Sequence, residues 1–472
     1  MKRAVFEDQM ARLTHSCGFE LQLLLKQGNA SLATKSRPAT RVSENFMFVV
    51  EAFLLILPPQ IYLSLLMKMN TSALLQALQA HVPALGVIDL LRALIQAPSY
   101  TGLPRQEEQV VNVLRHYFDN HGIVTEISQV QPGRPNLLAR ISGNAPGKRL
   151  LLCGHTDTVP PNKITATDPF AAKIRENRIH GRGAVDMKGA VAAMAAALVA
   201  LENLNALQRG EVILAAVIDE EMESRGAEAL INSGFIADAA IIGEPTSNQI
   251  AIGHKGLEWL EVEFLGKATH GGTPDKGINA IAAAARFVSI VEDELAPALL
   301  ARTHAVLGAP TINMGTIHGG DQPSTVAARC TIQLDRRWAP GESVEQVFAE
   351  LEDILTRVRA CMPGLRTALR RVPGGMATMI HGPLEIAINH HLVIAAQNAR
   401  EHVCGAPGEL TAFPAWTDAA LLSREAKIPS LVCGPGDLSL AHAPEESIAI
   451  TEVEEALKLF ALTAVHFLNE SQ

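Results

Sequence analysis

The alternation of apolar and polar residues changes its period along the chain and predicts the order of the elements. From about residue 70 to residue 249, short apolar runs of strand length alternate with longer runs in which apolar residues recur every three or four positions. This alternation predicts an α/β fold with an open, largely parallel sheet. We expect strands near 136–142, 149–153, 211–218 and 239–242, an amphipathic helix over 106–121, and a buried, Ala-rich helix from about Met187.

The pattern changes at about residue 250. Strands are expected at 256–267, 311–317, 326–338 and 365–372, with helices at 278–294 and 343–359. This βαββαβ order is that of the ferredoxin-like split unit, which can form a separate small domain. The α/β pattern returns after 373 and ends with a helix over 452–468. We therefore predict a catalytic domain in two parts, 70–249 and 373–472, interrupted by an inserted α+β domain at 250–372.

The first residues of the chain show no sustained period, and we treat 1–69 as an extension of uncertain structure. Within it, 46–67 is apolar enough to suggest a membrane anchor, but Glu51 and a proline pair interrupt the run. A natural start at Met67 or Met69 is another interpretation, because an ordinary helical pattern follows at once. We expect no membrane attachment.

Composition adds limits on size and partners. A chain of 472 residues suits two to three domains, and an apolar fraction of 48% allows a large core. The formal net charge of −9 and the pI of about 6.0 argue against broad nucleic-acid binding, which needs a basic face. The six cysteines are scattered without CxxC pairs and are expected to be reduced thiols of a cytoplasmic protein.

The candidate chemistry begins in the string RLLLCGHTDTVPP, where an apolar strand leads to His155 and Asp157. Residues two apart in an extended segment point the same way, so both side chains should face one site, in an arrangement typical of metal ligands. The alternative is a turn whose polar groups merely satisfy the backbone. Most further candidates also follow apolar runs, and an open α/β sheet places its site at the carboxyl ends of its strands. These candidates are Asp186, Glu220, Glu221, Glu244 and His442.

Two histidines and three carboxylates suit two zinc ions, if one carboxylate bridges them and each ion keeps a position for water. The set is His155, Asp186, Glu221, Glu244 and His442. The remaining carboxylate, Glu220, could act as general base on that water. Each residue also has an ordinary interpretation: Asp186 as a helix N-cap, the acidic triplet as a solvated turn, Glu244 as a turn residue and His442 as a surface histidine. The site would be absent only if all of these ordinary interpretations were true at the same time.

The strings GHTDTVPP, GRGAVDMKGA, DEE, GEPTS and AHAPEES, in this order, resemble the acetylornithine deacetylase, succinyl-diaminopimelate desuccinylase and aminoacylase family of zinc amidohydrolases and metallopeptidases. The resemblance covers about 70–468. It implies one bridging carboxylate, two ligand pairs, a general base and an orienting group that does not touch metal. These would be Asp186 as the bridge, His155 with Glu244 on one ion, Glu221 with His442 on the other, Glu220 as base and Asp157 behind His155.

The same resemblance implies that the inserted domain mediates homodimerisation and closes over the substrate. His270 in GKATHGGTPDKGINAI matches the family's oxyanion-stabilising histidine, and Arg337 in LDRRWAPGE matches a string whose guanidinium suits a substrate carboxylate. The alternatives are a polar residue of a Gly-rich loop and a charged surface residue. After IHGGDQP this chain has Ser324 where the family usually has asparagine, so we expect substrate positioning to differ from that of familiar members.

We therefore predict a two-zinc hydrolase of linear amides that removes the acyl group from an N-acyl amino acid, of the acetylornithine deacetylase or succinyl-diaminopimelate desuccinylase type. A dipeptidase or carboxypeptidase acting on short peptides is the alternative, and carbamoyl-type substrates are a third option. A non-catalytic binding protein is disfavoured, because neither Glu220 nor any proposed ligand is lost. Metal removal should abolish activity, and added Zn2+ or Co2+ should restore it.

Overall fold

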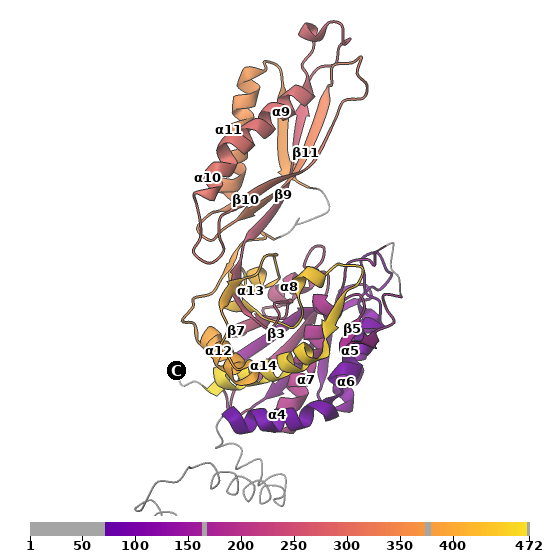
Figure 1. Cartoon of the computed structure of the whole chain (residues 1–472), viewed down its shortest axis with the longest axis vertical. Coiled ribbons are helices and arrows are strands. Elements are labelled where there is room, and N and C mark those ends of the chain that lie inside the picture. Colours follow the sequence, from indigo (N-terminus) through magenta and orange to yellow (C-terminus); the bar gives the residue numbers. More distant parts are fainter. Residues whose placement is uncertain (1–70, 163–167, 373–378, 470–472) are drawn as a thin grey trace, which may run out of the picture. The chain divides into compact units, whose positions relative to one another are not determined.

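A computed structural model of the chain describes residues 71–162, 168–372 and 379–469, which belong to one compact unit (Figure 1). The predicted extension 1–69, with its apolar run 46–67, lies outside the described residues.

The larger sheet has nine strands and is mixed. Its strands are β1 (Thr125–Gln131), β2 (Arg134–Ser142), β3 (Arg149–His155), β6 (Glu211–Val217), β7 (Ala239–Ile242), β8 (Ile250–His254), β13 (Leu384–Glu385), β14 (Leu410–Ala412) and β15 (Ser430–Val432). The strand order is β1-β2-β6-β3-β7-β15-β8-β13, and β14 also pairs with β8. Figure 1 shows β3 and β7 near the middle of this sheet.

The prediction of a largely parallel sheet is wrong, because the sheet is mixed; outside the centre, the short strand β14 is the described strand that pairs in parallel, with β8. Pairing is parallel from β6 through β3 and β7 to β15. It is antiparallel at β1–β2, β2–β6, β15–β8 and β13–β8. The antiparallel edge arises because β1 and β2 join through a tight turn at Gly133, whose positive φ of 76° suits glycine, whereas parallel strands need a long crossover.

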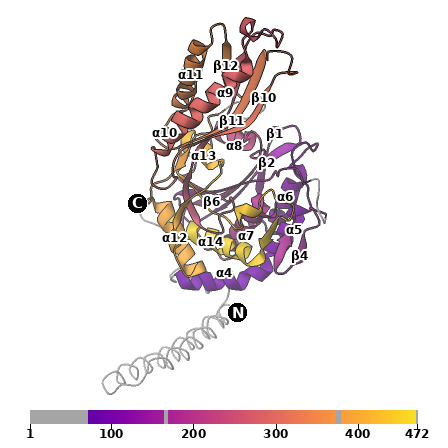
Figure 2. The ribbon, with the colours of Figure 1, turned by 45° about the horizontal axis from the view of Figure 1, so that its top comes forward.

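Helices cover both faces of this sheet. They are α4 (Thr71–Leu85), α5 (Val87–Ile95), α6 (Glu108–Asn120), α7 (Gly189–Asn203), α8 (Arg225–Asn232), α12 (His391–Cys404), α13 (Ala419–Arg424) and α14 (Ile450–Asn469). On one face, α7 packs against the sheet and contacts α14, which in turn lies along α12 (Figures 1 and 2). On the other face, α8 and α13 contribute Leu230 and Leu422 to a cluster that includes Leu151.

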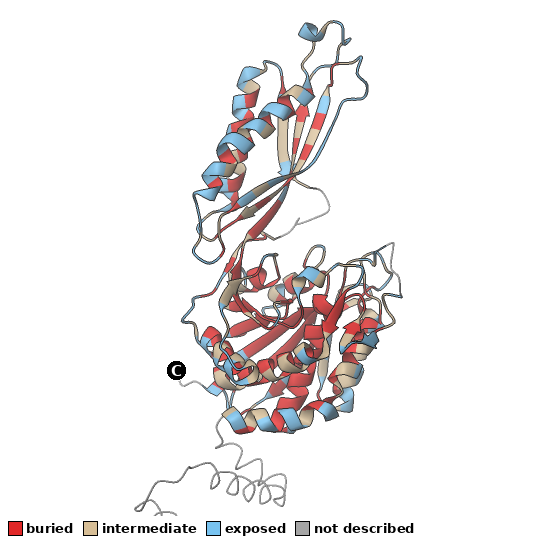
Figure 3. Ribbon diagram, viewed as in Figure 1, coloured by how far each residue is buried: buried red, intermediate tan, exposed pale blue. Residues whose placement is uncertain are grey.

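The central strands are buried because both of their faces are apolar. Strands β3, β6 and β7 are almost continuous apolar runs, as expected of strands covered on both sides (Figure 3). The alanines of α7 are buried along most of its length, which confirms the predicted buried helix. These strands therefore form a rigid base from which the side chains at their carboxyl ends project.

The segment after β8 forms a second sheet, with four antiparallel strands in the order β10-β11-β9-β12. Its elements are β9 (Gly256–Leu265), α9 (Ala280–Ile290), α10 (Ala296–Leu300), β10 (Thr311–Gly319), β11 (Arg329–Trp338), α11 (Val344–Cys361) and β12 (Arg366–Arg371), with short turns η2 (Pro274–Lys276) and η3 (Val291–Leu295). The chain order β9-α9-β10-β11-α11-β12 agrees with the predicted βαββαβ unit. Phe264 and Phe287 pack edge to face in its core, with ring centroids 5.7 Å apart.

A small third sheet brings the C-terminal segment back to the middle of the chain. It contains β4 (Lys173–Arg175), β5 (Arg178–His180) and β16 (Ser447–Ala449), in the order β16-β5-β4. Two irregular segments complete the described elements: the turn η1 (Ala184–Lys188), which leads into α7, and η4 (Leu438–Leu440). The third sheet thus places the residues before β16 beside those that follow β5.

The cysteines were expected to be reduced thiols, and the Ala-rich helix to be buried. Within the described residues, Cys153, Cys330 and Cys433 are buried and, like the other cysteines there, free. In that same part of the chain, Ala184–Asn203 is long and apolar enough to cross a membrane, and α4 with α5 passes the same criterion as a bent pair. The Ala184–Asn203 segment is fully buried by the surrounding protein, which is typical of a core helix.

Candidate metal centre

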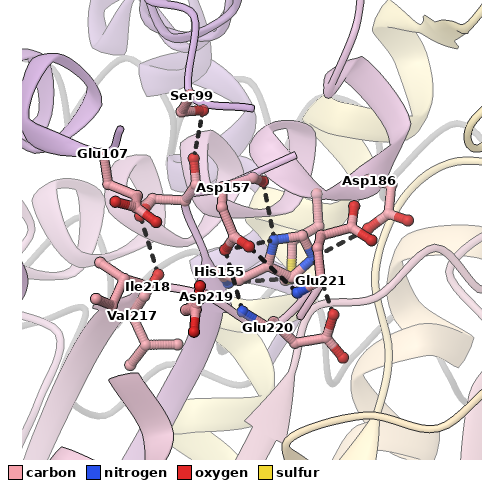
Figure 4. A network of polar contacts seen from close by, with 12 residues as sticks. Ser99, Glu107, His155, Asp157, Asp186, Val217, Ile218, Asp219, Glu220 and Glu221 are labelled. Atoms are coloured by element: carbon pink, nitrogen blue, oxygen red, sulfur yellow. Dashed lines mark hydrogen bonds and ion pairs between the residues drawn. The ribbon is translucent and has the colours of Figure 1, made fainter. Parts of the chain in front are cut away.

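The predicted ligands gather at the carboxyl ends of three neighbouring strands and in two adjoining loops. Figure 4 shows His155, Asp186 and Glu221 of this set. Strands β6, β3 and β7 lie side by side and lead to Glu220, Glu221, His155 and Glu244. The loops contribute Asp186, from the turn η1, and His442, two residues after η4. A site that the sequence spreads over nearly 300 positions is therefore assembled at one edge of the sheet, as the strand-end rule predicts.

Asp186 lies between the two histidines. Its Oδ1 is 3.0 Å from Nε2 of His155, and its Oδ2 is 3.1 Å from Nε2 of His442. Nε2 of His442 is also 3.3 Å from Oε1 of Glu221. The helix that follows, α7, has Lys188 at its N-cap and no capping side chain, so the N-cap interpretation of Asp186 is wrong. Each oxygen of Asp186 serves a different imidazole, which is the arrangement that a bridging carboxylate needs.

Glu220 and Glu244 lie near the same ring nitrogen of His155 that Asp186 contacts. Their carboxylate oxygens are 4.0 Å and 3.8 Å from Nε2 of His155. The Glu220 side chain is 12% exposed and that of Glu221 is 8% exposed, so the acidic triplet is not a solvated turn. Oε1 of Glu244 is buried and has no hydrogen-bond partner among the described residues. A buried carboxylate oxygen without a partner costs free energy unless a cation or donor reaches it.

Asp157 lies at the opposite edge of the His155 ring, beside Nδ1, and its carboxylate binds backbone amides. Its two carboxylate oxygens accept hydrogen bonds from the amides of Glu220 and Glu221, both at 3.2 Å. Nδ1 of His155 lies 3.0 Å from the carbonyl oxygen of Asp157 and 3.5 Å from its Oδ1. Asp157 therefore ties the turn after β6 to the histidine at the end of β3, as Figure 4 shows.

The electrostatics of the cluster are those of crowded carboxylates. Burial, followed by the charge of neighbouring carboxylates, raises the pKa of Glu220 and Glu244 well above the usual value. Burial and then Asp186 raise the pKa of Glu221. Burial alone would raise the pKa of Asp186, but its hydrogen bonds to the histidines outweigh burial and lower it. The hydrogen bonds of His442 to Asp186 and Glu221 raise the pKa of His442 to about 10.

The donor set fits divalent metal ions. Two groups of three side chains have ligand atoms close enough to hold an ion, namely His155 with Asp186 and Glu221, and His155 with Glu220 and Glu244. Imidazole nitrogens and carboxylate oxygens are ligands that zinc accepts. A cation would offset the repulsion among the carboxylates and satisfy the unpartnered oxygen of Glu244. Glu220 belongs to the second of these groups, so its position suits a metal ligand as well as a general base.

The three predicted residues of the second sheet fall into two places. His270 and Ser324 lie together: His270 pairs with Thr325 through a β-bridge, and the carbonyl of Ser324 accepts a 2.7 Å bond from the amide of Gly271. His270 and Ser324 are both exposed. Arg337 lies near the carboxyl end of β11, and its guanidinium donates to both oxygens of Asp335 at 2.8 and 3.0 Å. The described residues include no contact that joins any of the three to the carboxylate cluster.

Sequence reasoning missed several buried charges around the centre. Asp418 is 2% exposed, and burial raises its pKa to about 7. Arg134 pairs with Glu107 and Asp219, and Arg182 pairs with Glu446. The sequence contains only weak signals for these residues. Asp418 precedes the apolar run AALL, and Glu446 is the second glutamate in AHAPEES. Such residues contact the backbone or one another, so their spacing in the sequence has no pattern.

Comparison with known proteins identifies the family. Residues 151–466 match the family described as peptidase family M20/M25/M40. The chain is similar to the acetylornithine deacetylase of Photorhabdus laumondii, with 32% identity over 399 residues that cover 80% of this chain and 97% of that protein.

Two solved structures have a similar fold. Aminopeptidase PepT from Bacillus cereus aligns with a TM-score of 0.68 and 20% identity, over 81% of this chain and 98% of that chain. The YXEP protein of Bacillus subtilis, described as a dinuclear metal-binding peptidase, aligns with a TM-score of 0.61 and 18% identity, over 81% of this chain and 97% of that chain. At these identities the likeness concerns the fold alone.

Proposed function

The chain belongs to peptidase family M20/M25/M40 and is a metal-dependent hydrolase of amide bonds, and from this premise we propose that it removes the acyl group from an N-acyl amino acid. The products would be a carboxylate and a free amine. The observation that carries this proposal is the similarity to an acetylornithine deacetylase over 97% of that protein's length. The cluster of histidines and carboxylates at the ends of β6, β3 and β7 is consistent with the same chemistry.

We propose that the centre holds two zinc ions, with Asp186 shared between them. His155 and Glu244 would hold one ion, and Glu221 and His442 the other. The supporting observations are the contacts of the two Asp186 oxygens with different imidazoles and the unpartnered Oε1 of Glu244. When bound, such ions polarise the scissile carbonyl and lower the pKa of water. Co2+ has similar ligand preferences and should be able to replace zinc.

The proton transfers are assigned to Glu220. Its carboxylate would accept a proton from the attacking water and then give that proton to the leaving nitrogen as the C–N bond breaks. Burial raises its pKa, which makes the carboxylate a stronger proton acceptor than an exposed glutamate. Asp157 would fix this base in position, because its carboxylate holds the amides of Glu220 and Glu221. It would orient His155 without touching metal.

The second sheet would supply substrate contacts and a dimer interface. We assign the oxyanion to His270, substrate positioning to Ser324 and the substrate carboxylate to Arg337. Because the described residues place His270 in no contact with the carboxylate cluster, its role requires either closure of 250–372 over the substrate or a histidine from a second copy. Strand β10 supports the latter, since it is an edge strand on which Ile317 is 53% exposed. We place the homodimer in the cytoplasm, acting on small molecules.

A panel of substrates tests the proposed function. The zinc-loaded protein would be assayed with N-acetyl, N-succinyl and N-formyl amino acids and with dipeptides, before and after exhaustive chelation. We expect deacylation of at least one N-acyl amino acid, loss of activity on chelation, and recovery with Zn2+ or Co2+. Turnover that persists in fully metal-free protein would exclude the metal-dependent mechanism.

A peptidase is the second candidate, and the names of the structural relatives favour it. PepT of Bacillus cereus is described as an aminopeptidase, and a relative from Sulfolobus solfataricus as a metallo-carboxypeptidase. The same centre would cleave a peptide bond by the same steps. Faster turnover of dipeptides than of every N-acyl amino acid in the panel would establish this alternative.

A further inference from the structure

A buried ion pair lies behind the candidate metal centre and has no part in the chemistry proposed above. Nη1 of Arg182 donates to Oε2 of Glu446 at 2.5 Å, and the two side chains are 3% and 2% exposed. Taking two charges out of water is costly, and further hydrogen bonds from the pair help to offset that cost. Nε of Arg182 is buried without a partner in the described residues, whereas both terminal nitrogens of its guanidinium and both oxygens of Glu446 have partners. The other partners of this pair therefore indicate what it does.

Glu446 holds the turn that carries Asp186. Its Oε1 accepts hydrogen bonds from the amides of Val185 and Asp186, at 2.9 and 3.2 Å. Its Oε2 accepts a third from the amide of Gly183, at 3.0 Å. The backbone at Asp186 is not helical, with φ −121° and ψ 96°, so the turn η1 cannot satisfy these amides by itself. One carboxylate thus fixes the conformation of the segment that presents Asp186.

Arg182 extends the same connection to the other loop of the centre. Its Nη2 donates to the carbonyl oxygen of His442 at 3.3 Å and to Oδ1 of Asn162 at 2.7 Å. His442 has a positive φ of 60°, a left-handed conformation that is uncommon for any residue with a side chain. The guanidinium therefore binds the carbonyl group of a residue whose left-handed backbone conformation is energetically unfavourable. A planar fork suits this task, because it reaches a carboxylate and a carbonyl at once.

We propose that the Arg182–Glu446 pair is a positioning device that holds Asp186 and His442 at a fixed separation and so sets the affinity of the centre for the metal ion these two residues share. This inference rests on the proposed two-metal function. The pair touches neither substrate nor metal, and it acts only through the backbone of the two loops. Contacts between outer residues and metal ligands typically change metal affinity by about 10- to 100-fold when they are removed.

Three variants test the proposal. Glu446→Gln keeps the shape of the side chain, but its amide has one acceptor oxygen where three amides and a guanidinium now donate. Arg182→Lys keeps the charge pair but loses the fork that reaches His442. Glu445→Gln is the matched control, because it removes the same charge from an exposed neighbour in the sequence. For each metal-free protein, Zn2+ affinity and stoichiometry would be measured by competition with a chromogenic chelator, and the visible spectrum would be recorded with Co2+.

We expect both the wild type and Glu445→Gln to bind two ions, and each ion should bind the control variant as tightly as it binds the wild type. Glu446→Gln should bind one of them about 10- to 100-fold more weakly, with an altered Co2+ spectrum, and saturating Zn2+ should restore most of its kcat. Arg182→Lys should show a smaller loss of the same kind. It also decides the question if Glu446→Gln does not fold, because it retains a cation beside the glutamate.

Wild-type affinity for both ions in a folded variant would overturn the inference while leaving the proposed function intact. A wild type that binds no Zn2+ would instead overturn the proposed function itself.

Discussion

Replacing Glu220 by Gln tests whether this residue transfers protons or binds metal. Glutamine has the same size but cannot accept a proton, and the proposed mechanism uses this carboxylate twice, first on the water and then on the leaving nitrogen. General acid–base catalysis contributes about 10²- to 10⁴-fold, so kcat should fall by that factor, which corresponds to about 3–5 kcal/mol in the barrier. KM should change little. The metal-free variant should also unfold at a higher temperature, because it removes a carboxyl group whose pKa is raised first by burial and then by neighbouring carboxylates.

The assay needs both kinetics and metal content. Steady-state rates with the best N-acyl amino acid would be compared with the number of ions retained after gel filtration. Because Glu220 also belongs to a ligand-like group with His155 and Glu244, loss of one ion in the variant would show that it is a ligand and not the base. A kcat within tenfold of the wild type, with two ions bound, would refute the proton-transfer role. Glu223→Gln, which lies in the same turn and pairs with Arg225, is the control and should keep near-wild-type activity.

Three further predictions address the surroundings of the site. Burial, with a smaller contribution from a nearby arginine, lowers the pKa of His381 to about 4, so this histidine should account for a loss of roughly 3 kcal/mol of stability in metal-free protein as the pH falls from 6.5 to 4. Burial lowers the pKa of His254 to about 4 as well, so His381→Gln should reduce the slope in denaturant titrations by its own share and leave the remainder. A Cβ on Gly434 would lie 2.2 Å from the carbonyl oxygen of Gly243, so Gly434→Ala should cost about 1–3 kcal/mol in thermal unfolding, whereas Gly315→Ala, whose Cβ would meet only one atom at 3.5 Å, should cost much less. Asp157→Asn should keep both ions but lower kcat about tenfold or more, because one carbonyl oxygen replaces two acceptors for the turn that carries the base; unchanged kcat would contradict this role.

The strands that the sequence predicted well are the buried ones. β3 and β7 begin where their apolar runs begin, because a strand covered on both faces must be apolar throughout. β1, with the sequence TEISQVQ and a largely exposed surface, was not predicted, since neither of its faces is continuously apolar. The sheet was expected to be largely parallel because helices and strands alternate along the chain, and this alternation does not show the antiparallel pairings β2–β6, β15–β8 and β13–β8. β13 and β14 have two and three residues, too few for any period to be recognised.

The candidate site was predictable to the extent that strand ends determine it. His155, Glu221 and Glu244 could be placed together because each follows a strand, and the order of strands in the sheet brings those ends into contact. The sequence did not show which residues hold the loops of the site in place. Glu446 contacts residues about 260 positions earlier through backbone amides, which leave no trace in side-chain spacing. The roles within 250–372 depend on how that segment meets the substrate, and they stay predictions.

The position of β15 has a consequence for how the chain is made. This strand, Ser430–Val432, occupies the place between β7 and β8, although β7 and β8 leave the ribosome one after the other and much earlier. A nascent chain therefore has a gap in its main sheet, with unpaired backbone along β7, until residues 430–432 have been translated. At roughly 5–20 residues per second, this interval lasts on the order of ten seconds or more. During that time an open strand edge can pair with another chain, so newly synthesised protein should need protection from aggregation at this stage.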